Sequence, residues 1–62
     1  MDPGALLPLA KAHALLGVSR ATFEKYVKTP GLLPTYKLPS GQRRWRRADV
    51  LALARLINRE AS

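Results

Sequence analysis

Residues 36–47 read YKLPSGQRRWRR, two short alternating segments on either side of a Ser-Gly pair at 40–41. The Ser-Gly pair supplies the backbone freedom that a tight hairpin turn requires. Side chains alternate along a strand, so Trp45 can point inward while Arg44 and Arg46 point outward. The stretch therefore predicts a small β-hairpin with an apolar underside and a cationic outer face.

The first strand of this hairpin has a weaker alternation than the second. Tyr36 and Leu38 fall on one face, and Thr35 and Lys37 fall on the other. We expect Trp45 to fill the space beneath Tyr36 or Leu38, because an indole buries a large apolar area in so small a protein.

The chain has 62 residues and a formal net charge of +7, with eleven lysines and arginines against four acidic residues. This length predicts one domain, residues 1–62, in which residues 1–7 form a flexible arm. The excess of positive charge points to a polyanionic partner. There is no cysteine for a disulfide or a thiolate metal site, and His13 is the only histidine.

Membrane and export signals are not expected. No apolar run approaches the ~20 residues that cross a bilayer. The N-terminus has no basic residues at its start, and its apolar residues are interrupted by Pro3, Gly4 and Pro8. We therefore expect no signal peptide and a cytoplasmic protein.

Two helices are predicted before the hairpin. The first covers residues 9–16, with Pro8 in its first turn and Gly17 ending it. Ser19 is a good N-cap for a second helix over residues 20–28. In that helix we expect Phe23 and Tyr26 to face the core, and Glu24 to pair with Lys28 four residues on.

A third helix is predicted to begin near Ala48 and to end at about Arg59. Asp49 lies in its first turn, where a negative charge suits the helix dipole. Its apolar stripe consists of Val50, Leu53, Ala54 and Ile57, widened by Leu51 and Leu56.

The fold class is therefore expected to be mainly α with a small β-hairpin, in the order helix, helix, strand, strand, helix. Residues 12–27, AHALLGVSRATFEKYV, have the small residue, glycine turn and capped second helix of a helix-turn-helix. With the hairpin as a wing, the pattern indicates a winged helix-turn-helix that binds DNA.

The chain resembles the excisionase and MerR-like family of winged helix-turn-helix proteins over residues 9–57. The resemblance rests on GVSRAT at 17–22, LLPTYKL at 32–38 and GQRRWRRADVLAL at 41–53. Two positions depart from the family pattern, which usually has a small residue at His13 and a serine cap at Ala48.

The resemblance implies that the second helix enters the major groove and that the hairpin follows the adjacent backbone or minor groove. The candidate DNA-binding residues of the second helix are Ser19, Arg20, Thr22, Glu24, Lys25 and Lys28. Those of the wing are Lys37, Ser40, Gln42, Arg43, Arg44 and Arg46.

Strict MerR-type regulators carry a long dimerisation helix and an effector domain after this module, whereas this sequence ends soon after Ile57. The chain is more similar to the phage excisionases, also called recombination directionality factors. These bind several neighbouring sites, bend DNA and direct an integrase toward excision. The resemblance implies a monomer that self-associates side by side on DNA. The wide apolar arc of the last helix makes Leu51 and Leu56, together with residues 5–7, the candidate contacts.

Two alternatives remain open on the sequence. One is a small phage or prophage transcriptional regulator of the same fold. The other is a basic RNA-binding domain, which is disfavoured because Phe23, Tyr26 and Tyr36 are all expected in the core. We expect no catalytic residue, metal, cofactor or small-molecule ligand.

Overall fold

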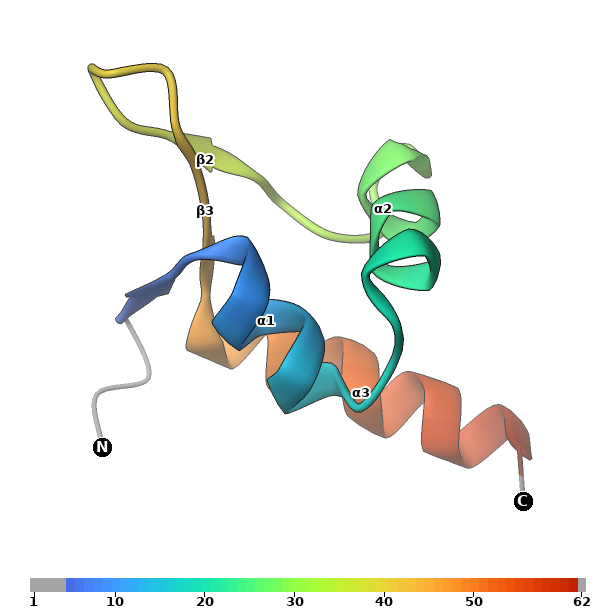
Figure 1. Ribbon diagram of the computed structural model, residues 1–62. Helices are drawn as coiled ribbons and strands as arrows, with labels where there is room; N and C mark the ends of the chain where they lie inside the picture. The colour runs from blue at the N-terminus through green and yellow to red at the C-terminus, as the bar shows by residue number, and fades with distance from the viewer. Residues whose placement is uncertain (1–4, 62) are drawn as a thin grey trace.

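The computed structural model describes residues 5–61, which form three helices and a small three-stranded sheet (Figure 1). The sheet is antiparallel with strand order β1-β3-β2. In chain order the elements are β1 (Leu6–Leu7), α1 (Leu9–Leu16), α2 (Arg20–Lys28), β2 (Tyr36–Lys37), β3 (Arg43–Arg46) and α3 (Arg47–Ala61).

The first two helices have the predicted bounds, and the predicted signals set them. The carbonyl of Pro8 accepts the amides of Lys11 and Ala12 at the start of α1. Gly17 ends α1 in the left-handed region, with φ of 82°, a conformation that costs glycine little. Ser19 caps α2 by accepting the amide of Thr22 at 3.2 Å.

The sheet has one strand more than the sequence predicted. Residues 6 and 7, expected in a flexible arm, instead pair with β3, where Leu6 lies opposite Arg46 and Leu7 opposite Trp45. The carbonyl of Ala5 also accepts the amide of Arg47 at 2.9 Å. The extra strand was not expected because a stretch of two residues is too short to show an alternation of apolar and polar side chains. The rest of the predicted arm, residues 1–4, lies outside the described part of the chain.

The hairpin turn is built as predicted, but its register places Tyr36 on the other face. The amide of Gly41 donates to the carbonyl of Leu38 at 2.8 Å, and Gly41 has φ of 90°. Tyr36 lies opposite Arg44, and directly opposed residues share a face, so Tyr36 points outward with that arginine. It is 37% exposed, and the prediction that it belongs to the core is wrong.

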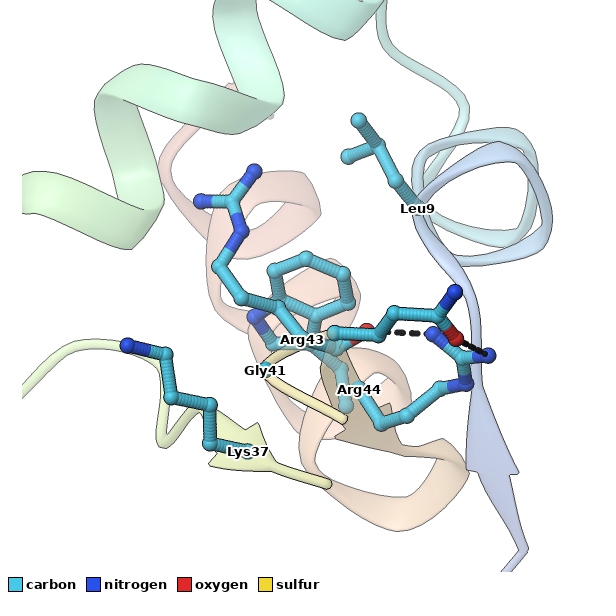
Figure 2. Close-up of a pocket in the computed structure, with 7 residues that line it drawn as sticks. Leu9, Lys37, Gly41, Arg43 and Arg44 are labelled. Carbon is cyan, nitrogen blue, oxygen red and sulfur yellow. Dashed lines mark hydrogen bonds between the residues drawn. The ribbon is translucent and has the colours of Figure 1, made fainter. Parts of the chain in front are cut away.

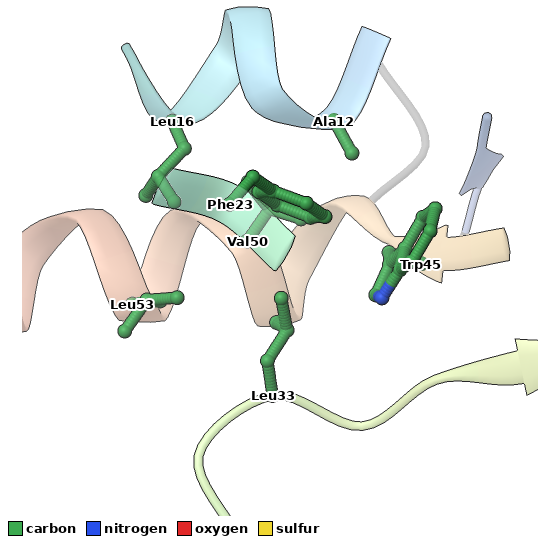
Figure 3. Packing of buried hydrophobic residues seen from close by; sticks show 7 residues of the cluster. All are labelled: Ala12, Leu16, Phe23, Leu33, Trp45, Val50 and Leu53. Atoms are coloured by element: carbon green, nitrogen blue, oxygen red, sulfur yellow. The ribbon is translucent and has the colours of Figure 1, made fainter. Parts of the chain in front are cut away.

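Seven buried side chains form the core between the helices and the inner face of the sheet (Figure 3). The Trp45 ring is fully buried and meets the Phe23 ring edge-on, with centroids 5.1 Å apart. Its Nε1 donates to the Thr35 hydroxyl at 2.9 Å, so its one polar atom is satisfied. The buried residues are Ala12, Leu16, Phe23, Leu33, Trp45, Val50 and Leu53.

Helix α3 follows β3 without a connecting residue. The Arg46 Nε and Nη2 donate to the two carboxylate oxygens of Asp49 at 2.9 and 3.1 Å, which fixes the corner. On this helix Val50 and Leu53 are buried as predicted, whereas Leu56 is 42% exposed.

We predict that Trp45→Ala leaves most molecules unfolded at 25 °C. Truncating a buried tryptophan costs about 3–5 kcal/mol, which approaches the whole stability of a small domain. Leu56→Ala, on the exposed side of α3, should change the free energy of unfolding by less than about 0.5 kcal/mol. Urea unfolding followed by circular dichroism measures both, and a cooperative, near-wild-type transition for Trp45→Ala would contradict the role assigned to this side chain.

Candidate nucleic-acid interface

Helix α2 presents three cationic side chains to solvent. Arg20, Lys25 and Lys28 are exposed, and within residues 5–61 their side chains form no hydrogen bond or ion pair. At 100° per residue, Lys25 and Lys28 lie on the side of the helix opposite to the buried Phe23. Their charges are therefore available to an anionic partner.

Ser19 and Thr22, also predicted to contact DNA, are engaged with each other at the start of this helix. The Ser19 hydroxyl accepts the Thr22 amide and donates to the Thr22 Oγ1 at 3.0 Å. Their hydroxyls complete the cap, and the Thr22 side chain is half-buried.

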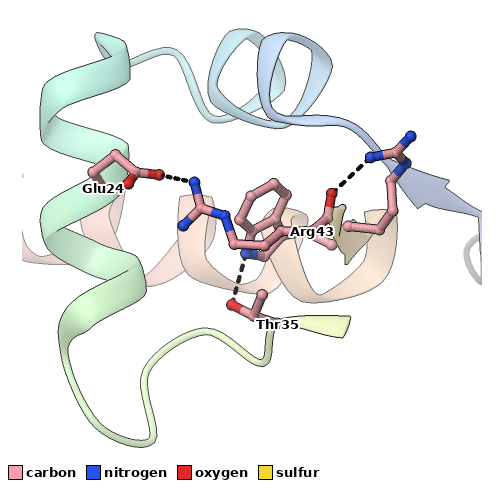
Figure 4. Close-up of polar contacts among 5 residues, drawn as sticks. Glu24, Thr35 and Arg43 are labelled. Atoms are coloured by element: carbon pink, nitrogen blue, oxygen red, sulfur yellow. Dashed lines mark hydrogen bonds and ion pairs between the residues drawn. The ribbon is translucent and has the colours of Figure 1, made fainter. Parts of the chain in front are cut away.

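Glu24 connects α2 to the sheet, as Figure 4 shows. Its Oε1 accepts the Arg43 Nη2 at 2.8 Å, and the two side chains are 30% and 38% exposed. The Arg43 guanidinium also lies 5.2 Å from the centroid of the Trp45 ring. The predicted pair between Glu24 and Lys28 is absent from the structure; Arg43, which shares the inner face of the sheet with Trp45, takes the carboxylate instead.

The remaining wing residues lie at the hairpin. Arg44 donates from Nη1 to the carbonyl of Arg43 at 2.8 Å and from Nη2 to the Gln42 Oε1 at 2.9 Å. Lys37 and Ser40 are exposed. Two of the wing arginines thus have carboxylate partners within the chain, and a third is held by its own hairpin.

Arg46, on the outer face of the sheet, takes part in both an ion pair and a cation–π contact. Besides its pair with Asp49, its guanidinium lies 5.3 Å from the centroid of the Tyr36 ring. The hydrogen bonds and the charge of Asp49 raise the pKa of Arg46 above its ordinary value.

A hollow of about 400 Å³ opens between the hairpin and the start of α1 (Figure 2). Three of its lining residues are cationic and none is acidic. A single phosphate group fits this chemistry, because lysine and arginine donate several hydrogen bonds to its oxygens. The lining residues are Leu9, Lys37, Gly41, Gln42, Arg43, Arg44 and Trp45.

A second hollow, of about 370 Å³, shares Leu9 with the first and is bordered by Arg20 at the start of α2. His13 also borders it, and its Nδ1 lies 3.1 Å from the carbonyl oxygen of Val18, within hydrogen-bonding distance. In Figure 1, α2 and the hairpin turn project from the α1 and α3 pair toward the same side. The first hollow is lined by the hairpin, the second by Arg20 of α2, and both are lined by Leu9 of α1.

Two further kinds of site were searched for in residues 5–61. No three histidine, aspartate or glutamate side chains gather there around a common point that could hold a metal ion. None of the helices in this part of the chain has the length and apolarity to span a bilayer.

Two residues that organise the site were not singled out as partners from the sequence. Thr35 accepts the Trp45 indole, and Asp49 holds Arg46. The i, i+3 spacing of Arg46 and Asp49 is a usable signal for an ion pair. The Thr35 contact depends on strand register and leaves no such signal.

Comparisons with protein-family models, with curated proteins and with solved structures find no match for this chain.

We predict that Glu24 and Arg43 are energetically coupled and that Glu24 and Lys28 are not. In a double-mutant cycle, Glu24→Gln with Arg43→Gln should give a coupling free energy of about 0.5–1 kcal/mol, as expected for a partly exposed pair. The matched cycle of Glu24→Gln with Lys28→Gln should give less than about 0.3 kcal/mol. Urea unfolding at low and high salt checks this, and a larger coupling to Lys28 would refute the observed pairing.

Proposed function

We propose that the chain is a winged helix-turn-helix protein that binds double-stranded DNA. Helix α2 is assigned to the major groove, and the hairpin between β2 and β3 is assigned to the neighbouring backbone. The observation that carries the proposal is the set of three exposed cations of α2 that form no hydrogen bond or ion pair within residues 5–61: Arg20, Lys25 and Lys28.

An α-helix with its side chains is about 10–12 Å across and fits the major groove of B-DNA, which is about 12 Å wide. The exposed side of α2 also carries Ala21, whose methyl group leaves the helix free to approach base edges closely. Lys25 and Lys28 supply phosphate contacts, which give affinity and set orientation.

The wing contributes through the hollow lined by Lys37, Arg43 and Arg44. A backbone phosphate there would lie beside three cations while α2 occupies the groove. The Glu24–Arg43 ion pair supports this arrangement because it fixes the distance between helix and hairpin. Glu24 has its Oε2 left for a cytosine amino group, the base contact that suits a carboxylate.

Within this class, we propose an excisionase-like role for the protein: binding to several neighbouring sites, bending of the DNA and direction of an integrase toward excision. The support is the resemblance in residues 17–22, 32–38 and 41–53 together with the order of helices and strands. A transcriptional regulator would use the same groove contacts, so the layout of binding sites distinguishes the two roles.

Footprinting on genomic fragments captured by the purified protein tests the role directly. Several protected sites in direct repeat, about one helical turn apart and beside an integrase core site, are expected. A single or inverted site at a promoter would favour the regulator, and the absence of any protected duplex would overturn both roles.

We predict that Lys25→Ala and Lys28→Ala each reduce the slope of log K against log salt by about 0.9 for duplex DNA. Arg55→Ala is the matched control, because it removes one exposed cation from α3. It should leave the slope within error of the wild type. Binding measured by fluorescence anisotropy over a salt series gives these slopes, and equal losses in all three variants would mean that α2 does not face the DNA.

A further inference from the structure

The outer face of the sheet, turned away from the helices, carries an exposed aromatic ring among cations. The strand register places Leu6, Tyr36, Arg44 and Arg46 on this face, and we call these four residues the outer sheet face. Leu6 and Tyr36 are two of the large apolar side chains that the described chain leaves exposed. Phe23 and Trp45, by contrast, are fully buried on the inner side.

Arg46 is held as a fixed plane on this face. Asp49 binds one edge of its guanidinium through two hydrogen bonds, and the Tyr36 ring lies against it with a guanidinium-to-centroid distance of 5.3 Å. The Arg46 side chain nevertheless stays 46% exposed. Flat aromatic rings and guanidinium planes are the groups on which unpaired nucleobases stack.

Arg44 provides the charge that such a ligand needs. It lies directly opposite Tyr36 across the strand pair. A guanidinium has five N–H donors, and the two hydrogen bonds of Arg44, to Gln42 and to the carbonyl of Arg43, leave donors for a phosphate oxygen. A stacking surface and a phosphate donor therefore stand side by side.

We propose that the outer sheet face is a second nucleic-acid site, which binds single-stranded DNA by stacking a base on the Tyr36–Arg46 pair and holding a phosphate with Arg44. A base pair within a duplex cannot reach this site, because its faces are covered by its neighbours in the stack. The choice of DNA over RNA rests on the proposed duplex-binding function. Tyr36 and Arg46 lie on the face of the sheet opposite to Arg43 and Trp45, whereas Arg44 also borders the hollow assigned to the duplex, so the test relies on Tyr36.

The test measures the binding of two probes by two sets of variants. The probes are an end-labelled oligothymidylate of about 12 nucleotides and a labelled duplex from the footprinted region, both followed by fluorescence anisotropy. Tyr36→Thr should weaken oligothymidylate binding about tenfold or more, since each stacked base contributes strongly. Tyr36→Phe keeps the ring and should bind as the wild type does. Neither variant should change duplex binding by more than about twofold.

Lys25→Ala with Lys28→Ala should give the opposite result, with weaker duplex binding and little change for oligothymidylate. If Tyr36→Thr fails to fold, Tyr36→Val replaces it, because valine suits a strand and removes the ring, and it should weaken oligothymidylate binding to a similar extent.

Unchanged oligothymidylate binding in Tyr36→Thr, or equal losses on both probes, would overturn the second site whatever the duplex result. Tighter binding of oligouridylate than of oligothymidylate would overturn its assignment to DNA. If no variant loses duplex binding while Tyr36→Thr still weakens oligothymidylate binding, the result counts against the proposed function and leaves the second site standing.

Discussion

The burial of Trp45 holds the two halves of this protein together. Its ring lies edge-on to Phe23 of α2, its Nε1 donates to Thr35 ahead of β2, and its strand leads directly into α3. A core of seven buried side chains leaves little else to join sheet and helices. Because the indole is fixed from several sides, Arg43 next to it is also fixed, and its guanidinium reaches Glu24 from a defined position.

The distribution of charge follows from this arrangement and not from composition alone. The chain carries a formal charge of +7, yet Arg43 and Arg46 are each partnered by a carboxylate. The repulsion expected in a dense arginine cluster is thereby reduced within the fold itself. Helix α2, by contrast, carries three cations without a carboxylate partner within residues 5–61, of which Lys25 and Lys28 extend into solvent. Arg43 and Arg46, which are held by carboxylates, keep fixed positions in the fold, whereas lysines without a partner are suited to phosphate contact.

The sheet separates two surfaces with different chemistry. Its inner face contributes Arg43 to the hollow between the hairpin and the start of α1, a cationic surface suited to a phosphate group. Its outer face exposes Tyr36 beneath Arg46, a surface suited to flat unpaired bases. Side chains alternate along β3, so one four-residue strand supplies both surfaces.

The sequence by itself determined the helices, the turn and the identity of the buried tryptophan. Proline, glycine and serine act locally, so Pro8, Gly17 and Ser19 fixed the bounds of α1 and α2 without help from distant residues. Tertiary structure alone decided the register of the sheet and the partners of its arginines. A two-residue strand has no periodicity to reveal its inward face, and the register that places Tyr36 opposite Arg44 turns Tyr36 outward, while the preceding Thr35 accepts the Trp45 indole. Glu24 likewise pairs with Arg43 and not with Lys28, its neighbour four residues on. The fold brings the Arg43 Nη2 to 2.8 Å from the Glu24 Oε1 and places the same guanidinium over the Trp45 ring, and no local spacing in the sequence encodes that position.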